Sequence, residues 1–259
     1  MYYKIFEKFK QSGILSPKEY KIYSILIKKI KTWLRQKVLA SKTSGITLGL
    51  SGGIDSTVLA LIAYEEFKDD AHFYYFKTKT DRKTENDIVK LQQYFNNSII
   101  TVDLTENFNA LTKTLKVTQV PIKSNIKSRL FMTSLYALSQ KHNTLVIGTD
   151  NFAEYYLGYF TKYGDGGVDL LPLANLQKSD IFVLGTLLDI PKTILEKKPT
   201  ANLCTATSDE DSLGFSYDEF ERWLIDEHLI DPEKSKRIKV LHKASLHKVS
   251  LIPKGPKLK

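Results

Sequence analysis

The chain has 259 residues, of which 42% are hydrophobic, and its formal net charge at pH 7 is +9. This length suits one large α/β domain or two small ones, and the hydrophobic fraction is sufficient for a real core. No run of about 18 apolar residues exists, and the first residues lack the apolar stretch of a signal peptide, so we expect neither a membrane span nor secretion.

The single cysteine, Cys204, cannot form an internal disulfide, which favours a cytoplasmic protein. The positive charge raises the possibility of a nucleic-acid-binding protein. Only five of the 38 basic residues are arginines, however, and the lysines are spread along the chain. We therefore interpret most of the charge as solvated lysine faces, some of which could draw anionic nucleotides toward a cleft.

The hydrophobic pattern predicts strands that alternate with helices from about residue 17 onward. The predicted strands are 46–50, 71–76, 98–102 and 144–147, and the predicted helices are 17–39, 57–67, 83–95, 104–115, 125–141, 178–189, 217–228 and 232–248. This alternation predicts an α/β fold, with a doubly wound (Rossmann-like) parallel sheet and helices on both of its faces. We expect one domain over 1–259, with N-terminal helices at 1–40, a nucleotide-binding α/β core at 41–175 and a mainly helical part at 176–259.

The most informative segment lies between residues 46 and 63. Its start fits a buried strand, its centre reads Ser51-Gly52-Gly53-Ile54-Asp55-Ser56, and its end fits a helix packed on a sheet. Glycines let the main chain approach a ligand closely, and the free amides at a helix start favour an anion. The carboxylate of Asp55 would repel a bare phosphate, so its presence indicates a hard cation such as Mg²⁺ between the two.

This loop matches neither Gly-x-x-x-x-Gly-Lys-Ser/Thr nor Gly-x-Gly-x-x-Gly. It resembles the pyrophosphate-binding PP-loop, Ser-Gly-Gly-x-Asp-Ser, of enzymes that split ATP into AMP and pyrophosphate and adenylate a substrate. The alternative is an ordinary Gly-Gly turn between a strand and a helix. The resemblance implies a PP-loop, adenine nucleotide alpha hydrolase-like fold. It also implies ATP contacts from Gly49, Leu50, Ser51, Gly52, Gly53, Ile54, Asp55 and Ser56.

A second segment, 148–169, carries acids, a lysine and several glycines beyond the last predicted strand. It begins Gly-Thr-Asp and ends Tyr-Phe-Thr-Lys-Tyr-Gly-Asp-Gly-Gly-Val-Asp. Together with the PP-loop it resembles the NAD synthetase family, which amidates nicotinic acid adenine dinucleotide (deamido-NAD). Asn125–Met132 and Pro172–Lys178 resemble two further motifs of that family. The resemblance covers roughly residues 20–253.

The resemblance places Asp55 and Glu154 on Mg²⁺, and two carboxylates with phosphate oxygens and waters are ordinary magnesium ligands. It places Thr149, Lys178 and Thr200 on ATP. Each role has a plainer alternative: a solvated helical glutamate, a helix N-cap at Thr149 and a loop hydroxyl at Thr200. A lysine at a helix start opposes the helix dipole, which favours a role for Lys178 outside its helix.

The resemblance implies that deamido-NAD is bound by the residues Arg129, Lys162, Asp169, His247 and Lys248. Arginine pairs bidentately with carboxylate or phosphate, and Arg129 is one of few arginines in a lysine-rich chain. A surface arginine on a helix is the alternative. The neighbouring pair His242-Lys243 competes with His247-Lys248 for the same role.

The segment around residues 198–210 departs from the family pattern. Asn202, Cys204, Ala206 and Thr207 replace the usual residues, whereas Asp209 and Glu210 persist. Ser128 and Phe131 also stand where the family usually has Ala and Arg. We interpret 202–208 as part of a loop over the site, and no nucleophilic role is needed from Cys204.

The resemblance implies the last step of NAD biosynthesis, in which deamido-NAD is adenylated by ATP and then attacked by ammonia, giving NAD, AMP and pyrophosphate. The implied catalytic residues are Asp55, Lys178, Asp169 and Asp209, and one of the last two would help deprotonate ammonium. We expect free ammonia as the nitrogen source, because there is no room for a glutaminase domain before Ser51. The family is homodimeric, and the apolar helix at 17–39 is a candidate interface element, unless it packs on its own sheet.

Three other interpretations remain open at this point. The first is another PP-loop adenylating enzyme, such as a tRNA-modifying or amidotransferase relative, which would be expected to lack the segment 148–169. The second is a catalytically impaired nucleotide-binding protein, for which the altered residues 202–208 are the only argument. The third, a basic RNA-binding protein, rests on charge alone.

Overall fold

The computed structural model describes residues 7, 9, 12, 14–79, 81–96, 99–197 and 208–256. At its centre lies a sheet of four parallel strands, as predicted, and the order of the strands is β3-β2-β1-β4. The strands are β1 (Gly45–Gly49), β2 (Ala71–Lys77), β3 (Ile99–Asp103) and β4 (Thr144–Val146). The two central strands are almost continuously apolar and buried, which is typical of parallel strands covered on both faces.

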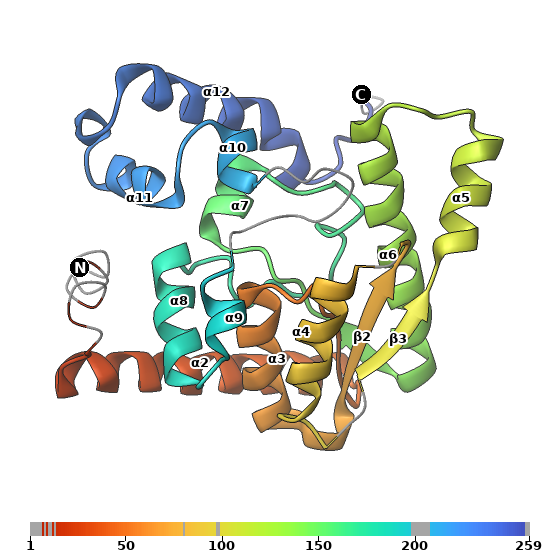
Figure 1. Cartoon of the computed structure of the whole chain (residues 1–259), viewed down its shortest axis with the longest axis horizontal. Helices are drawn as coiled ribbons and strands as arrows, with labels where there is room; N and C mark the ends of the chain where they lie inside the picture. Colours follow the sequence, from red (N-terminus) through yellow and green to blue (C-terminus); the bar gives the residue numbers. More distant parts are fainter. Residues whose placement is uncertain are drawn as a thin grey trace.

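Helices cover both faces of the sheet (Figure 1). One face carries α3 (Ile54–Phe67), which packs against α2 (Pro17–Ser41) and α8 (Lys178–Leu187) in the larger hydrophobic cluster. The other face carries α6 (Val120–His142), beside which α5 (Thr105–Thr114) lies. Because α3 lies between the sheet and two other helices, its buried residues surround its axis instead of forming one stripe.

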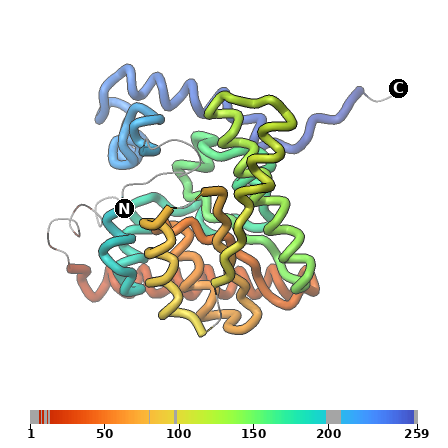
Figure 2. Tube along the Cα trace, turned by 45° about the vertical axis from the view of Figure 1, so that its right-hand side comes forward, coloured from red at the N-terminus to blue at the C-terminus, as the bar shows by residue number. Residues whose placement is uncertain are grey.

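Four further helices gather beyond the carboxyl ends of the strands, at the top of Figure 1. They are α7 (Phe152–Leu157), α10 (Asp209–Leu213), α11 (Tyr217–Ile225) and α12 (Pro232–Val249). They share a second hydrophobic cluster around Phe215 and Phe220. Figure 2 shows the same helices, drawn in green and blue, stacked above the sheet from another direction. This helical layer therefore covers the edge of the sheet where ligands bind in such folds.

The remaining helices are α4 (Arg82–Gln92), α9 (Lys192–Leu195) and the short 3-10 helices η1 (Lys68–Asp70) and η2 (Glu227–Leu229). Two differences from the prediction affect elements that lie near the cavity: the start of α6 and the presence of α7. Helix α6 begins at Val120, five residues early, because Pro121 in the first turn does not interrupt a helix. Helix α7 lies where we predicted a loop: Asn151 and Glu154 cap it reciprocally, and Gly158 ends it at φ 62°.

Most of the predicted apolar stripe of α2 faces the chain's own core, whereas Ile25 and Leu39 are 42% and 68% exposed. Tyr23, Ile30, Leu34 and Val38 are its buried residues and belong to the larger cluster or pack directly against it. The buried part of the stripe packs on the chain's own core, and a role of α2 in an interface stays a prediction. None of the helices in the described ranges is long and apolar enough to cross a membrane.

The strand order places a topological switch point beside β1. From β1 the chain first adds β2 and β3 on one side, and only later returns to add β4 on the other side. The loops that follow β1 and β4 therefore diverge and leave a crevice between them. Those loops carry the two motifs singled out in the sequence.

Candidate active site

The loop after β1 is a glycine turn that leads into α3. Gly52 adopts φ +71°, a left-handed conformation that favours glycine, and Gly53 is the N-cap of the helix. Gly53 offers no side-chain cap, so the first amides of α3 have no partner from the N-cap side chain. The Ser51 and Ser56 hydroxyls lie 3.1 Å apart, and Ser51 Oγ accepts from the Gly53 amide at 3.2 Å. The loop thus has the amide and hydroxyl donors of an anion site.

A lysine and two carboxylates meet at the start of α3. The Lys178 ammonium, from the first residue of α8, contacts Asp55 Oδ2 and lies 3.9 Å from Glu154 Oε1. Asn151 donates from Nδ2 to Asp55 Oδ1 at 3.0 Å and from its backbone amide to Glu154 Oε2 at 3.0 Å. The capping box of α7 therefore also sets the distance between the two carboxylates.

Burial and mutual repulsion shape the titration of this cluster. Burial and then the Asp55 charge raise the pKa of Glu154 to about 7, against the opposing effect of Lys178. Burial lowers the pKa of Lys178, but Asp55 and Glu154 outweigh it and the net shift is upward. Asp55 and Glu154, whose side chains are each 16% exposed, thus share a single ammonium at this point.

The donor chemistry of this cluster fits a hard divalent cation. Asp55 and Glu154 supply carboxylate oxygens from two different elements, which is the kind of ligand that Mg²⁺ takes. Among the described residues no group of three or more His, Cys, Asp or Glu side chains is arranged for a metal. A magnesium ion here would therefore complete its coordination with phosphate oxygens and water, as is usual for Mg²⁺ at nucleotide sites.

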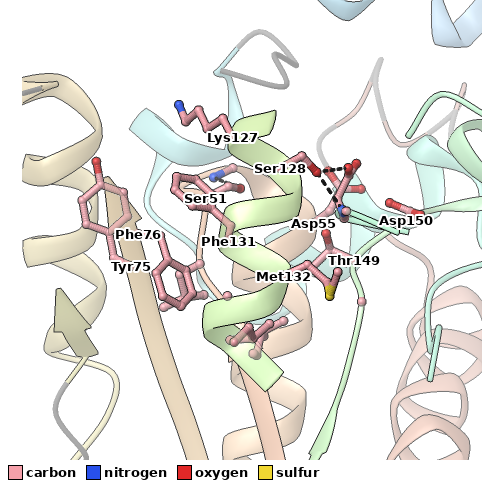
Figure 3. A pocket seen from close by; sticks show the side chains of 18 of the residues that line it. Ser51, Asp55, Tyr75, Phe76, Lys127, Ser128, Phe131, Met132, Thr149 and Asp150 are labelled. Atoms are coloured by element: carbon pink, nitrogen blue, oxygen red, sulfur yellow. Dashed lines mark hydrogen bonds between the residues drawn. The ribbon is translucent and has the colours of Figure 1, made fainter. Parts of the chain in front are cut away.

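The cluster lines a cavity of about 290 Å³ that opens from the crevice between β1 and β4. One side of this cavity is apolar: Phe76 of β2 and Phe131 of α6 stack with their ring centroids 5.4 Å apart. Figure 3 shows these rings together, with Met132 also on α6 and the acids Asp55 and Asp150 toward the opposite side. An apolar slot next to an anion loop is suited to the base and phosphates of a nucleotide.

Most of the predicted ATP residues meet at this cavity. The members that line it are Gly49, Leu50, Ser51, Gly53, Ile54, Asp55, Thr149 and Lys178. Gly52 and Ser56 shape the loop behind them. Glu154, predicted to hold the metal, and the acid Asp209 line it as well. The segment 198–207, which includes Thr200 and Cys204, lies outside the described residues.

The residues predicted to hold the dinucleotide lie apart from the cavity lining. Arg129 donates from Nε and Nη2 to the Lys162 carbonyl at 3.2 Å each. Lys162 in turn donates to the His247 carbonyl, and Lys248 donates to the carbonyls of Gly158 and Phe160 at 2.7 Å each. These contacts join the segment 158–162 to the end of α12. The substrate role of this group stays a prediction.

Asp169, predicted both as a substrate and as a catalytic residue, is engaged by its own chain. It accepts from the Tyr136 hydroxyl at 3.0 Å and from the Val146 amide at 2.8 Å. His242, the alternative to His247, stacks on Tyr156 with centroids 3.9 Å apart and contacts its carbonyl. In this conformation both side chains hold parts of the protein together.

One departure from the family motif has a clear local partner. Ser128 Oγ donates to Asp165 Oδ1 at 2.6 Å and accepts from the Asp165 amide at 2.8 Å. Asp165 Oδ1 also accepts from the Thr161 amide at 3.0 Å. Figure 3 shows Ser128 directed at this loop with its hydrogen bonds dashed. The hydroxyl thus ties α6 to the turn at 161–167.

Sequence reasoning missed three residues of the site. Lys197 lines the cavity and donates to the Gly52 carbonyl at 3.3 Å and to buried Asp87 at 3.0 Å.

The other two missed residues are Asp150 and Tyr217. Asp150 lines the cavity at 5% exposure, and its Oδ2 has no hydrogen-bond partner among the described residues. Burial and then Asp165 raise the pKa of Asp150. Tyr217 donates to Glu154 Oε1 at 3.3 Å from the distant helix α11. Of these, only Asp150 had a signal, as part of the Gly-Thr-Asp motif.

Comparison with known proteins agrees with this geometry. The family model described as NAD synthase matches residues 26–254 of the chain. A relative named NH(3)-dependent NAD(+) synthetase, from Mycoplasmopsis pulmonis, is 43% identical over 223 residues, which is 86% of each chain.

Two solved structures share the fold over almost the whole chain. One, an NMN synthetase from Francisella tularensis, is 37% identical with a TM-score of 0.83 and covers 93% of this chain and 99% of its own. The other, an NH3-dependent NAD synthetase from Campylobacter jejuni, is 26% identical with a TM-score of 0.79 and covers 91% of this chain and 99% of its own.

Proposed function

The chain belongs to the NAD synthase family, and on that premise we propose that it joins ammonia to the nicotinate carboxyl group of deamido-NAD to give NAD. It is then a C–N bond-forming ligase, with ATP as the co-substrate that its family uses. The observation that carries the proposal is the meeting of Asp55, Glu154 and Lys178 over the glycine loop at the switch point of the sheet.

The first step is adenylation of the acid. A carboxylate is a poor acyl donor because its leaving group would be an oxide, so the nicotinate oxygen attacks the α-phosphorus of ATP and pyrophosphate leaves. Negative charge builds up on the phosphates during this step. The Lys178 ammonium, the amides at the start of α3 and the Ser51 and Ser56 hydroxyls are the groups of this chain that would stabilise it.

Magnesium belongs to the same proposal. Asp55 and Glu154 would hold Mg²⁺, which supplies charge neutralisation on the phosphate oxygens. Lys178 already lies between these carboxylates, so the lysine and the metal-binding acids form one cluster. The apolar slot of Phe76 and Phe131 would take the adenine ring.

The second step is attack of ammonia on the acyl-adenylate, which expels AMP and forms the amide. No covalent bond to the protein is required. Attack by neutral ammonia needs removal of one proton from ammonium beforehand, and of a second proton from the attached nitrogen as the amide forms. We assign this to the acids of the cavity, with Asp209 on α10 lining it directly, whereas Asp169 would first have to release Val146 and Tyr136.

A second acid, nicotinic acid mononucleotide, is supported as the acceptor of ammonia by one of the similar structures. The similar structure from Francisella tularensis is an NMN synthetase, and the acid that corresponds to NMN is nicotinic acid mononucleotide. Both acids carry the same nicotinate carboxyl group, so the adenylation chemistry would be unchanged. We rank deamido-NAD first because the relative at 43% identity is named for NAD.

One assay tests the proposal and separates the two acceptors. Purified protein is incubated with Mg-ATP, ammonium and either deamido-NAD or nicotinic acid mononucleotide, and the amides are separated by chromatography. We expect NAD with a higher kcat/KM than NMN, and no product without ATP. A higher kcat/KM for the mononucleotide would replace the proposed acceptor, and no amide from either acid would refute amide synthesis. Asp55→Ala is the matched inactive control.

A further inference from the structure

Helix α11 directs two residues at the active site from outside the α/β core. Tyr217 and Glu221 are four residues apart and therefore lie on one face of the helix. They are 5% and 4% exposed. Ser216 and Glu219 form the capping box that fixes the start of this helix, and Figure 1 shows α11 in the layer above α8.

Tyr217 contacts both partners of the charged cluster. Its hydroxyl donates to Glu154 Oε1 at 3.3 Å, and its ring centroid lies 5.1 Å from the Lys178 ammonium. An aromatic face attracts a cation at this distance, and the hydroxyl satisfies a carboxylate oxygen that burial has taken from water. The Tyr217 amide is itself held by Glu210 at 2.9 Å, which fixes α11 to α10.

Glu221 holds the helix end from which Lys178 projects. Its Oε1 accepts from the backbone amide of Ser179 at 2.9 Å, and Ser179 directly follows Lys178 at the start of α8. An acceptor at this position satisfies one of the amides that a helix start leaves unpaired. The second oxygen, Oε2, has no hydrogen-bond partner within the described part of the chain. Within the described part of the chain, the buried Glu221 carboxyl group therefore has one hydrogen bond, and that bond comes from the backbone of α8.

We propose that Tyr217 and Glu221 are positioning residues for the adenylation step: Tyr217 orients Glu154 and the Lys178 ammonium, and Glu221 fixes the backbone of Lys178. This inference rests on the proposed function, because it assigns the two residues through Lys178 and Glu154. Neither residue has to touch the substrate. One face of α11 thereby joins the first turn of α8 to the carboxylate of α7.

The test compares four variants of the full chain with the wild type. Tyr217→Phe removes the hydroxyl and keeps the ring, and Glu221→Ala removes the acceptor. Glu221→Gln keeps an acceptor oxygen for Ser179 without the charge. Glu227→Gln is the matched control, since it makes the same acid-to-amide change just after α11, at a residue paired with Lys239 instead of the site. For each protein we measure kcat, the KM for ATP, the Mg²⁺ concentration at half-maximal rate, and the thermal unfolding midpoint.

We expect Tyr217→Phe and Glu221→Ala to lower kcat about tenfold, the effect of losing one hydrogen bond to a charged or helix-terminal group. Tyr217→Phe should also raise the half-saturating Mg²⁺ concentration, because Glu154 loses its orienting donor. Glu221→Gln should restore at least half of the wild-type kcat, and Glu227→Gln should leave all kinetic values unchanged. A residue with a merely structural role would shift the unfolding midpoint and leave these values unaltered in the folded protein.

Wild-type kcat and Mg²⁺ dependence in both Tyr217→Phe and Glu221→Ala would overturn the inference. If Glu221→Ala does not fold, Tyr217→Phe decides the inference alone. Wild-type kcat and Mg²⁺ dependence in Tyr217→Phe would then overturn it. The two proposals fail differently: a wild-type protein that forms no amide refutes the proposed function, whereas an active wild type with unaltered variants refutes only the positioning roles.

Discussion

At the scale of single residues, Lys178 is the cation on which the two metal-binding candidates converge. Its side chain is 13% exposed, and those of Asp55 and Glu154 are each 16% exposed. A buried charge is tolerated only where a partner compensates it. Removing the ammonium therefore leaves two carboxylates facing each other and removes a donor for the phosphates.

The first prediction concerns this lysine. Lys178→Met should lower kcat at saturating substrates about 100-fold or more, the typical effect of losing a charged group that stabilises a developing anion. Lys178→Arg should not restore the rate, because a planar guanidinium does not replace a compact ammonium. Steady-state rates, with circular dichroism to establish folding, check both variants. A Lys178→Met protein with more than half of the wild-type rate would contradict this assignment.

The second prediction concerns Gly52. Its φ of +71° is strained for any residue with a side chain, and a Cβ there would lie 3.1 Å from Thr84 Cγ2. Gly52→Ala should raise the KM for ATP and destabilise the fold by about 1–2 kcal/mol. Gly255→Ala is the control, since a Cβ at Gly255 meets nothing within 4 Å. Equal ATP KM values and unfolding midpoints in the two variants would show that the loop does not need this conformation.

At the scale of elements, the short helices at the carboxyl edge connect the motifs to one another. Helix α7 supplies Asn151 and Glu154 to the site while it packs into the second hydrophobic cluster. Helix α11 belongs to the same cluster and reaches α8 through Glu221. The helical layer is therefore part of the site's framework as well as its cover.

The third prediction is a pH dependence of stability at Glu221. Burial, and then the charges of Asp180 and Asp218, raise its pKa to about 7 against the hydrogen bond from the Ser179 amide. Folding then favours the protonated form, so its contribution to stability is fully present below the pKa of a free glutamate and is lost as the pH rises through 7. Glutamine has no charge to desolvate at any pH.

Glu221→Gln should therefore gain stability relative to the wild type as the pH increases, by on the order of 2 kcal/mol between about pH 5 and pH 8. Urea unfolding of both proteins at several pH values measures this difference. A difference that stays constant across the range, or that favours the wild type at high pH, would contradict a buried carboxyl with a raised pKa.

Elements with strong local signals could be predicted from the sequence. The apolar strands, the Gly52-Gly53 turn and the second motif placed Asp55, Thr149 and Glu154 at one edge of a parallel sheet, because strand ends converge there. The short helices α7, α9 and α10 were missed, since their few turns lack a clear apolar period. The contacts of Tyr217 and Lys197 could not be predicted, because each depends on how distant segments pack.

At the scale of the whole molecule, we propose a homodimer in the cytoplasm, as the family resemblance implies. The buried side of α2 packs within the chain, whereas Tyr20, Ile25 and Leu39 remain exposed on the same helix. We expect sedimentation equilibrium to give about twice the chain mass of 29.6 kDa. A monomer mass at the concentrations used for the activity assay would refute the dimer and would mean that no partner subunit contributes to the nucleotide site.

The central claim is that ATP activates the nicotinate carboxyl group by adenylation before ammonia attacks. The most direct test uses deamido-NAD whose carboxyl oxygens are ¹⁸O, with Mg-ATP and ammonium, and examines the products by mass spectrometry. Because the carboxylate oxygen that attacks the α-phosphorus stays on it, AMP should carry one ¹⁸O atom for each NAD formed, and pyrophosphate should carry none. Formation of NAD with ¹⁸O in pyrophosphate, or with no ¹⁸O in AMP, would contradict adenylation of the carboxyl group.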